Sequence, residues 1–330
     1  MSNHQNRKKI FTIINKDLNT ASTKFRVVQY LDFLREKGID FDFINRKTIN
    51  SQTIARAANY DVVFNQKSLF NISYAKKIIL NARHSVFDFD DAIYTREKKP
   101  YFWVTRLRVQ KRLHLWLKKA SVVTTANQFL ADYAQVFSNN VRVIPMALDM
   151  DIWKPKIKIA GNQVVIGWAG APVNIPLIEE LDPVFSYLLN KYPNLKLAIF
   201  SGKKPILTCP YDYHPFVAGK ETDFIQDLDI GLLPLIDEEF YYGKSPIKAI
   251  QYLACGVPVV GNAIGATREI LNPENSISIS SENDWIHAIE KLINNRNLIR
   301  SMGIAGREHV LLNHNYKLAA ERLYGVISKF

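Results

Sequence analysis

The 330-residue sequence has only two cysteines, Cys209 and Cys255, and they stand far apart. Two isolated cysteines without metal-ligand spacing argue against a disulfide framework and favour a reducing compartment. No apolar run approaches the ~20 residues that a membrane-spanning helix needs. The basic N-terminus, MSNHQNRKK, is followed by an apolar stretch too short for a signal segment. These absences lead us to expect a cytoplasmic protein.

Acidic residues are few relative to basic ones, because 31 Asp and Glu stand against 43 Lys and Arg, a formal net charge of +12. This excess favours anionic partners: nucleic acid, phosphorylated small molecules or an acidic membrane surface. The basic residues are spread over both halves and match no nucleic-acid-binding motif. We therefore expect no nucleic-acid partner, with a basic nucleic-acid-binding protein as an alternative. The histidines form no ligand pair, and we expect neither a metal nor another cofactor.

Short β-rich runs alternate with amphipathic helical runs, which predicts parallel βαβ units. The expected strands are KIFTII, IDFDFI, YDVVFNQ, SVFDFDD, SVVTTA and VRVIP in the first half, and VVIGWAG, LKLAIFSG, DIGLLPL and PVVGN in the second. The polar stretch KPKIKIAGNQ (154–163) separates the halves and predicts a linker. We expect an α/β protein of two Rossmann-like domains, residues 1–155 and 156–312, with the ligand at the carboxyl ends of the strands, in a cleft between the domains.

The stretch YYGKSPIKAIQYLACGVPVVGN (241–262) predicts a helix followed by a strand. Ser245 is a good N-cap and Pro246 a good first residue, while Gly256 is a typical end. The spacing places Ile247, Ile250 and Ala254 on the core face and Lys248, Gln251 and Tyr252 away from it.

Two lysines, Lys244 and Lys248, therefore lie at the start of this helix. Free backbone N–H groups and a partial positive charge are already present at a helix N-terminus. Together with Gly243, the lysines predict a phosphate site, although two solvated lysines on a surface helix are the alternative.

The segment DLDIGLLPLIDEEFYYGKSPIKAIQYLACGVPVVGNAIGATREI (227–270) resembles the C-terminal half of glycosyltransferase family 4 enzymes. Gly243 and Gln251 occupy the positions of that family's glutamate pair, and the sequence is similar to a branch with a Gly-Lys…Lys…Gln-Tyr pattern. VFDFDDAIY, ASVVTTANQFLADYA and VRVIPMALDMDIW match the same branch, so the resemblance covers most of residues 60–325.

This resemblance implies the GT-B fold, with an acceptor domain first, a donor domain second, and a C-terminal helix (313–330) that crosses back to the first domain. The packing stripe of that helix is expected to comprise Tyr316, Leu318, Ala319, Leu323 and Val326. The implied reaction is transfer of a hexose-like sugar from a nucleotide-diphosphate-sugar to a hydroxyl of a glycan or glycolipid, with retention of configuration and no metal requirement, in polysaccharide biosynthesis. A nucleotide-sugar epimerase on the same fold and a transferase that has lost activity are the alternatives.

The expected site draws on both halves. Asp90 ends a strand where related enzymes often have a histidine, so we predict that it contacts the sugar or acceptor, or acts as a base. Lys244 and Lys248 are expected to stabilise the leaving diphosphate. The expected donor contacts are Gly170, Gly243, Ser245, Gln251, Thr20 and Ser22, with Gly167 and Gly170 forming a tight turn. The expected acceptor-side residues are Arg26, Lys67, Asp88 and Asp91.

Two features of the first half allow more than one interpretation. The carboxylates of DFDD (88–91) could hold a metal ion, cap a helix or pair with Arg83 or Lys67. The stretch KPYFWVTRLRVQKRLHLWLKK (99–119) predicts a basic helix with aromatic residues, which would lie on an anionic membrane surface at the inner face of the membrane or pack on the sheet with solvated lysines outside.

Overall fold

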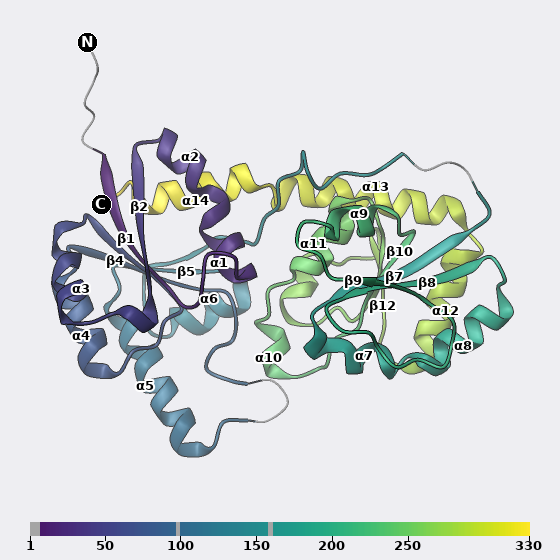
Figure 1. Cartoon of the computed structure of the whole chain (residues 1–330), viewed down its shortest axis with the longest axis horizontal. Coiled ribbons are helices and arrows are strands. Elements are labelled where there is room, and N and C mark those ends of the chain that lie inside the picture. The colour runs from purple at the N-terminus through teal and green to yellow at the C-terminus, as the bar shows by residue number, and fades with distance from the viewer. Residues whose placement is uncertain (1–6, 97–99, 158–160) are drawn as a thin grey trace, which may run out of the picture. The chain divides into compact units, whose positions relative to one another are not determined.

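The structure is a computed structural model that describes residues 7–96, 100–157 and 161–330 (Figure 1). Residues 1–6 of the basic N-terminus, Lys99 of the basic stretch and residues 158–160 of the linker lie outside the described residues. The chain divides into two compact units. Unit 1 holds the described residues up to Ala147 together with Glu238–Ser245 and Tyr316–Phe330, and unit 2 holds Leu148–Asp237 and Pro246–Asn315.

Unit 1 is built on a six-stranded parallel sheet of order β2-β1-β3-β4-β5-β6. Its strands are β1 (Lys8–Ile14), β2 (Ile39–Asn45), β3 (Val62–Gln66), β4 (His84–Phe89), β5 (Val122–Thr125) and β6 (Val141–Val143). Its helices are α1 (Ala21–Arg26), α2 (Leu31–Glu36), α3 (Ser51–Arg56), α4 (Ile72–Asn81), α5 (Trp103–Lys119), α6 (Gln128–Gln135), α10 (Glu239–Tyr242) and α14 (Tyr316–Ile327). All six predicted strands of the first half are present.

Apolar side chains alternate between the two faces of this sheet. Phe11, Val63 and Phe87 belong to a core with residues of α3 to α6. Ile10 and Val62, on the opposite face, belong to a core with residues of α2 and α14. Successive strand residues point to opposite sides, so a strand buried on both faces reads as a continuous apolar run such as KIFTII.

The predicted helix KFRVVQYLDFLREKG is broken into α1, a 3-10 turn (Val28–Tyr30) and α2. Val27 leaves the helical conformation, with φ −135° and ψ −58°. Arg26 and Val27 are both buried, Arg26 against polar groups and Val27 in the apolar core. The predicted end of the segment is confirmed, because Gly38 has φ +78°, which favours glycine.

The C-terminal helix α14 packs in the core of unit 1. Ala319, Leu323 and Val326 are buried there, as the sequence predicts, together with Ala320 and Ile327. The prediction for Leu318 is wrong, since its side chain is 39% exposed.

Unit 2 also contains a six-stranded parallel sheet, of order β12-β11-β10-β7-β8-β9. Its strands are β7 (Val164–Gly170), β8 (Leu195–Ser201), β9 (Asp212–Pro215), β10 (Ile230–Leu233), β11 (Val259–Gly261) and β12 (Ser276–Ser278). Its helices are α7 (Ile175–Glu179), α8 (Asp182–Lys191), α9 (Glu221–Gln226), α11 (Ile247–Ala254), α12 (Glu282–Ile293) and α13 (Arg296–Asn313). The edge strands β9 and β12 are too short and polar for the sequence pattern to indicate them.

The predicted fold class, α/β with two Rossmann-like sheets, is therefore confirmed. In each unit the strands are parallel, so their carboxyl ends share one edge, where ligands of such sheets bind. Among the described residues, no helix combines the length and apolar character needed to cross a membrane.

Candidate functional site

The carboxyl edge of the unit 1 sheet carries a buried polar cluster. The strand register sets Gln66 of β3 beside Asp88 of β4, and Asp88 beside Thr124 of β5. Asp90 and Asp91 follow directly after β4, which ends at Phe89. This edge therefore brings together, within one unit, the carboxylates that the sequence singles out.

Arg26 and Asp88 form a buried ion pair, with exposed fractions of 3% and 1%. Arg26 also donates to the carbonyl oxygen of Ile144, and the Thr124 hydroxyl donates to Asp88 at 2.7 Å. Each charged group thus has its partners inside the protein. The geometry gives Arg26 and Asp88 a structural function, with Arg26 joining α1 to the sheet, and their acceptor contact stays a prediction.

Lys67 bridges the other two carboxylates. Its Nζ lies 2.6 Å from Asp90 Oδ1 and 2.7 Å from Asp91 Oδ2. Lys67 is the non-glycine residue with positive φ among the described residues (φ 39°), and its backbone N–H donates to the Asp88 carbonyl at 2.7 Å. Non-glycine residues with positive φ are strained, and they occur often at functional sites, where the surrounding structure holds the residue in place.

The environment moves the pKa values of the two carboxyls apart. Burial favours the neutral form of Asp90, but the Lys67 ammonium and a hydrogen bond from Ser22 outweigh it and hold the pKa of Asp90 below its usual value. Burial and the Asp90 charge raise the pKa of Asp91, against the effects of Lys67 and Lys244. Burial alone would lower the pKa of Lys67, yet both carboxylates raise it above its ordinary value.

The first turn of α1 contributes Ser22 to this cluster. The Thr23 hydroxyl donates to Gln66 Oε1 at 2.9 Å, and Gln66 Nε2 donates to Ser22 Oγ at 3.2 Å. Thr20 instead precedes α1 as its N-cap, without a side-chain cap bond, and its hydroxyl donates to Asp17 at 3.1 Å. Ser22 is therefore beside Asp90, whereas Thr20 belongs to an exposed turn.

The dipeptide Gly243–Lys244 also belongs to unit 1. A Cβ on Gly243 would lie 2.8 Å from Leu130 Cδ2 and 2.9 Å from Ala92 Cβ. Glycine therefore allows residue 243 to pack closely against Ala92, the residue after Asp91. Lys244 lies over the Tyr241 ring at 4.7 Å. The structure thus associates Lys244 with the acidic cluster of unit 1, while Lys248 and Gln251 belong to unit 2.

Helix α11 begins later than predicted. It starts at Ile247 with Pro246 as its cap, so the prediction of Ser245 as a helix cap is wrong. The Ser245 hydroxyl oxygen is buried and has no hydrogen-bond partner among the described residues. Pro246 has ψ 32°, which delays the start of the helix by one residue.

The prediction that Gln251 and Tyr252 lie off the core face is also wrong. They are 3% and 0% exposed, because α11 is buried on more than one side. The Tyr252 ring packs against Gly231, where a Cβ would lie only 2.6 Å from the ring. The Tyr252 hydroxyl accepts a hydrogen bond from the Ala169 N–H at 2.9 Å. Tyr252 therefore ties α11 to the end of β7.

Lys248, on the first turn of α11, is half-buried and has no salt bridge to a described carboxylate. Burial lowers the pKa of Lys248 to about 8, and the distant charge of Glu221 only partly opposes it. One turn further, the Gln251 amide oxygen is buried without a hydrogen-bond partner in the described structure. A buried amide oxygen without a hydrogen-bond partner is destabilising unless a ligand pairs with it, and the half-buried Lys248 beside it offers a cation without a counter-charge among the described residues.

Three further unpaired atoms occur in the described part of unit 2: His309 Nε2 on α13, and one each on Ser201 and Asn174, whose function the sequence pattern did not indicate. Ser201 ends β8, beside Gly170 in the register, and its buried hydroxyl oxygen has no partner among the described groups. Asn174 precedes α7, and its buried Oδ1 is likewise unpaired there. Segments that meet the carboxyl edge of this sheet carry four of these polar residues, since each helix begins at the edge where the preceding strand ends: Lys248, Gln251, Ser201 and Asn174.

Gly170 has a packing function. It is the last residue of β7, so the predicted tight turn is wrong. A Cβ there would lie 2.0 Å from the buried Trp168 ring, and one on Gly167 would lie 2.3 Å from Leu228. The absence of a side chain at Gly170 and Gly167 leaves room for Trp168 and Leu228, respectively. Trp168 belongs to the apolar core.

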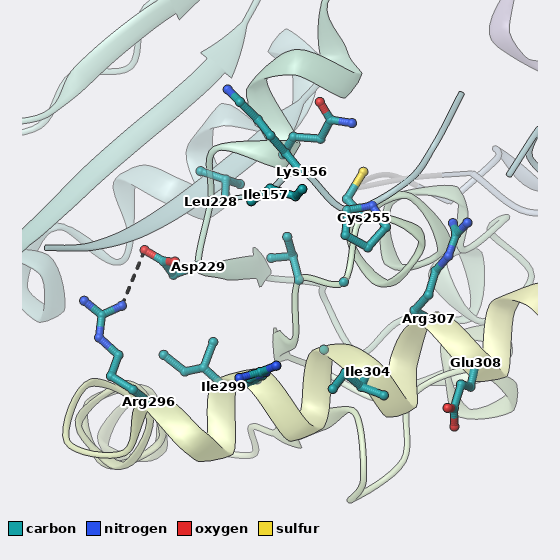
Figure 2. Close-up of a pocket in the computed structure, with 16 residues that line it drawn as sticks. Lys156, Ile157, Leu228, Asp229, Cys255, Arg296, Ile299, Ile304, Arg307 and Glu308 are labelled. Carbon is teal, nitrogen blue, oxygen red and sulfur yellow. Dashed lines mark ion pairs between the residues drawn. The ribbon is translucent and has the colours of Figure 1, made fainter. Parts of the chain in front are cut away.

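A cavity of about 710 Å³ opens at the opposite, amino edge of the unit 2 sheet (Figure 2). One face of α13 lines it, together with residues before β10 and β11. Three of its cations have partners in the protein: Arg296 faces Asp229 at 3.8 Å, Lys156 pairs with Asp227, and Arg307 donates to the carbonyl oxygens of Met150 and Ala254. These pairings give the cations structural partners, in contrast to Lys248.

The DFDD carboxylates have cationic partners, so the metal interpretation would require a divalent ion to displace Lys67. Arg83 pairs with Asp61 at 3.8 Å and takes no part in the cluster. Within the described ranges, no group of three or more His, Cys, Asp and Glu side chains has metal-site geometry.

Comparisons with known proteins agree with this architecture. The family model described as glycosyl transferase-like matches residues 188–325. The chain is similar to the structure of a sucrose-phosphate synthase from Thermosynechococcus elongatus, with a TM-score of 0.73 at 14% identity over 98% of this chain and 99% of that one. It is also similar to HepE of Anabaena in complex with UDP and glucose, with a TM-score of 0.69 at 13% identity over 98% and 100% of the chains.

A third similar structure is an alpha-glucosyltransferase in complex with UDP and a 13-mer DNA (TM-score 0.66, 11% identity, 98% and 100% of the chains). Because the identities are only 11–14%, these similarities establish the fold alone. That fold is the GT-B fold of glycosyltransferases. A search of curated protein sequences returned no match.

Proposed function

We propose that this protein is a glycosyltransferase that moves a sugar from a nucleotide-diphosphate-sugar to a hydroxyl of a glycan or glycolipid. The observation that carries the proposal is the unpaired polar set of unit 2, above all Lys248 and Gln251 on α11. The GT-B fold and the match of residues 188–325 support the same conclusion.

In this proposal Lys248 and the first turn of α11 bind the diphosphate. A phosphate oxygen supplies the counter-charge that Lys248 lacks, and charge-assisted hydrogen bonds are worth roughly 1.5–3 kcal/mol each. The Gln251 amide then hydrogen-bonds ribose hydroxyls, and Ser201 and Asn174 accept from the sugar or the ribose. Lys244 is assigned the same task, that of a cation for the leaving diphosphate. No metal is required, because the lysines and the helix N-terminus neutralise the developing charge.

Unit 1 supplies the acceptor side. A carboxylate whose pKa is held low by Lys67 is a weak base but a good hydrogen-bond acceptor. We therefore assign Asp90 to hydrogen bonding of sugar or acceptor hydroxyls and Lys67 to holding Asp90 ionised and oriented. Ser22 supports the same carboxylate. Transfer of a hexose with retention of configuration completes the proposal.

The direct test is an assay of the protein with UDP-, GDP-, ADP- and dTDP-glucose, with and without a lipid and glycan extract as acceptor. A transferase releases the nucleotide diphosphate faster when acceptor is present, and NMR of the product reports whether the anomeric configuration is retained. An epimerase, which the comparisons do not favour, would change the sugar without acceptor. The proposal is wrong if no donor is consumed with any acceptor, while the Lys248→Ala protein binds nucleotides as wild type does.

A further inference from the structure

The first half of α5 stands apart from the core of unit 1. Its second half is anchored, since Leu113, Trp116 and Leu117 are fully buried and the Trp116 ring stacks on Phe87 at 5.5 Å. The turns that begin at Trp103 extend away from the sheet, toward the bottom of the view (Figure 1). Fold stability therefore does not explain the residues of this first half.

Those turns expose large apolar side chains. Phe102 is 69% exposed, Trp103 64% and Leu107 48%, and Val104 adds a further 38%. Trp103 and Leu107 are separated by four residues, so they lie on the same side of the helix, and Val104 flanks them. Clustered exposed apolar groups mark a surface that meets another apolar environment.

The same helix is strongly basic. Its basic residues are Arg106, Arg108, Lys111, Arg112, Lys118 and Lys119, and Trp103–Lys119 contains no acidic residue. None of the first four forms a salt bridge to a carboxylate among the described residues, and Arg106, Arg108 and Lys111 are exposed. The apolar ridge is thus flanked by cations without counter-charges.

We propose that the exposed half of α5 docks on the surface of an anionic lipid bilayer. Trp103, Phe102 and Leu107 would enter the headgroup region, where amphipathic aromatic rings are stable, while Arg106, Arg108 and Lys111 contact lipid phosphates. The surface fits a bilayer better than a nucleic acid, because Leu107 and Val104 gain from an apolar boundary and offer nothing to a base. The proposal does not depend on transferase activity.

Co-sedimentation of the full chain with lipid vesicles tests it. We expect binding to vesicles of equimolar phosphatidylcholine and phosphatidylglycerol, weakened by salt, and much weaker binding to phosphatidylcholine alone. Each basic residue near an anionic surface contributes about fivefold in partitioning, so Arg106→Gln with Arg108→Gln should weaken binding about 25-fold. Trp103→Ala with Leu107→Ala should weaken it at least ~10-fold.

Helix α4 of the same unit provides the matched controls. Lys76→Gln with Lys77→Gln removes two exposed lysines, and Leu80→Ala removes a leucine that is 82% exposed. These proteins should bind within about threefold of wild type, since the surface potential decays within a Debye length. All substitutions are on exposed positions, and equal melting temperatures confirm that each variant is folded.

Three results would overturn the proposal: equal binding to both kinds of vesicle, no binding at low salt, or an equal loss in the α4 controls. Tight, salt-sensitive binding to duplex DNA that the α5 substitutions remove, without vesicle binding, would assign the surface to nucleic acid and would also overturn it.

Discussion

Replacing Lys67 with methionine tests the buried cluster of unit 1 most sharply. Methionine preserves much of the side-chain volume but removes the charge that holds Asp90 and Asp91. The Asp90 side chain is 3% exposed and that of Lys67 is 12% exposed, so solvent screens the pair weakly. Removing one partner of a buried pair destabilises a protein by roughly 3–5 kcal/mol, and we expect a loss of that size at pH 8.

The loss should depend on pH in a defined direction. In the wild type the folded-state pKa of Asp90 is lowered. Ionised Asp90 therefore stabilises the fold at pH values above its unfolded-state pKa of about 3.9, and this stabilisation is lost as the pH falls through the folded-state pKa. In Lys67→Met the same carboxyl is buried without its cation, which raises its folded-state pKa. The variant therefore regains stability as pH falls from 8 to 5, where the carboxyl is protonated in the folded state.

Hydrogen exchange of amides in β3 and β4 measures the free energy of unfolding of unit 1 separately from that of unit 2. Lys67→Met with Asp90→Asn is the matched control, since it removes the unpaired charge and should recover part of the loss at pH 8. A loss under about 1 kcal/mol at pH 8, or one as large at pH 5 as at pH 8, would refute the buried pairing.

Three further predictions concern single side chains. Gly243→Ala should lower unit 1 stability by about 1–3 kcal/mol, because its Cβ would meet Leu130 and Ala92 below 3.0 Å, and thermal unfolding measures the loss. Lys67→Gly should be more stable than Lys67→Ala by about 1 kcal/mol, the reverse of the usual order, because φ is +39°. Since the pKa of Lys248 is about 8, nucleotide-diphosphate affinity should fall up to ~10-fold per pH unit above that value, and calorimetry of Lys248→Met should show no such fall.

The sequence pattern was most informative where local rules decide the structure. Apolar runs bounded by polar loops predicted every strand of unit 1, and Gly38 and Gly256 ended their segments with φ +78° and +71°. The short edge strands β9 and β12 escaped prediction, because their pairing depends on neighbours distant in the chain. The break at Val27, between α1 and α2, also escaped prediction.

For the site, the sequence indicated individual residues but not the surroundings of each side chain. The sequence indicated Asp90, Lys67 and Ser22, and the structure brings these three together in unit 1. The burial of Gln251 could not be inferred from helical spacing, because α11 packs on more than one side. Ser201 and Asn174 carried no signal in the sequence, since an unpaired hydroxyl or amide is recognised only from its surroundings.

Thermal unfolding with UDP, GDP, ADP, dTDP and CMP tests whether α11 carries a nucleotide-diphosphate site. A nucleotide at ~100 times its Kd should stabilise the native state by about 2.7 kcal/mol. We expect a shift in melting temperature with at least one diphosphate, lost in Lys248→Ala and kept in the control Lys196→Ala, which removes an exposed lysine of β8. An equal shift in wild type and Lys248→Ala, or no shift with any nucleotide, would contradict it.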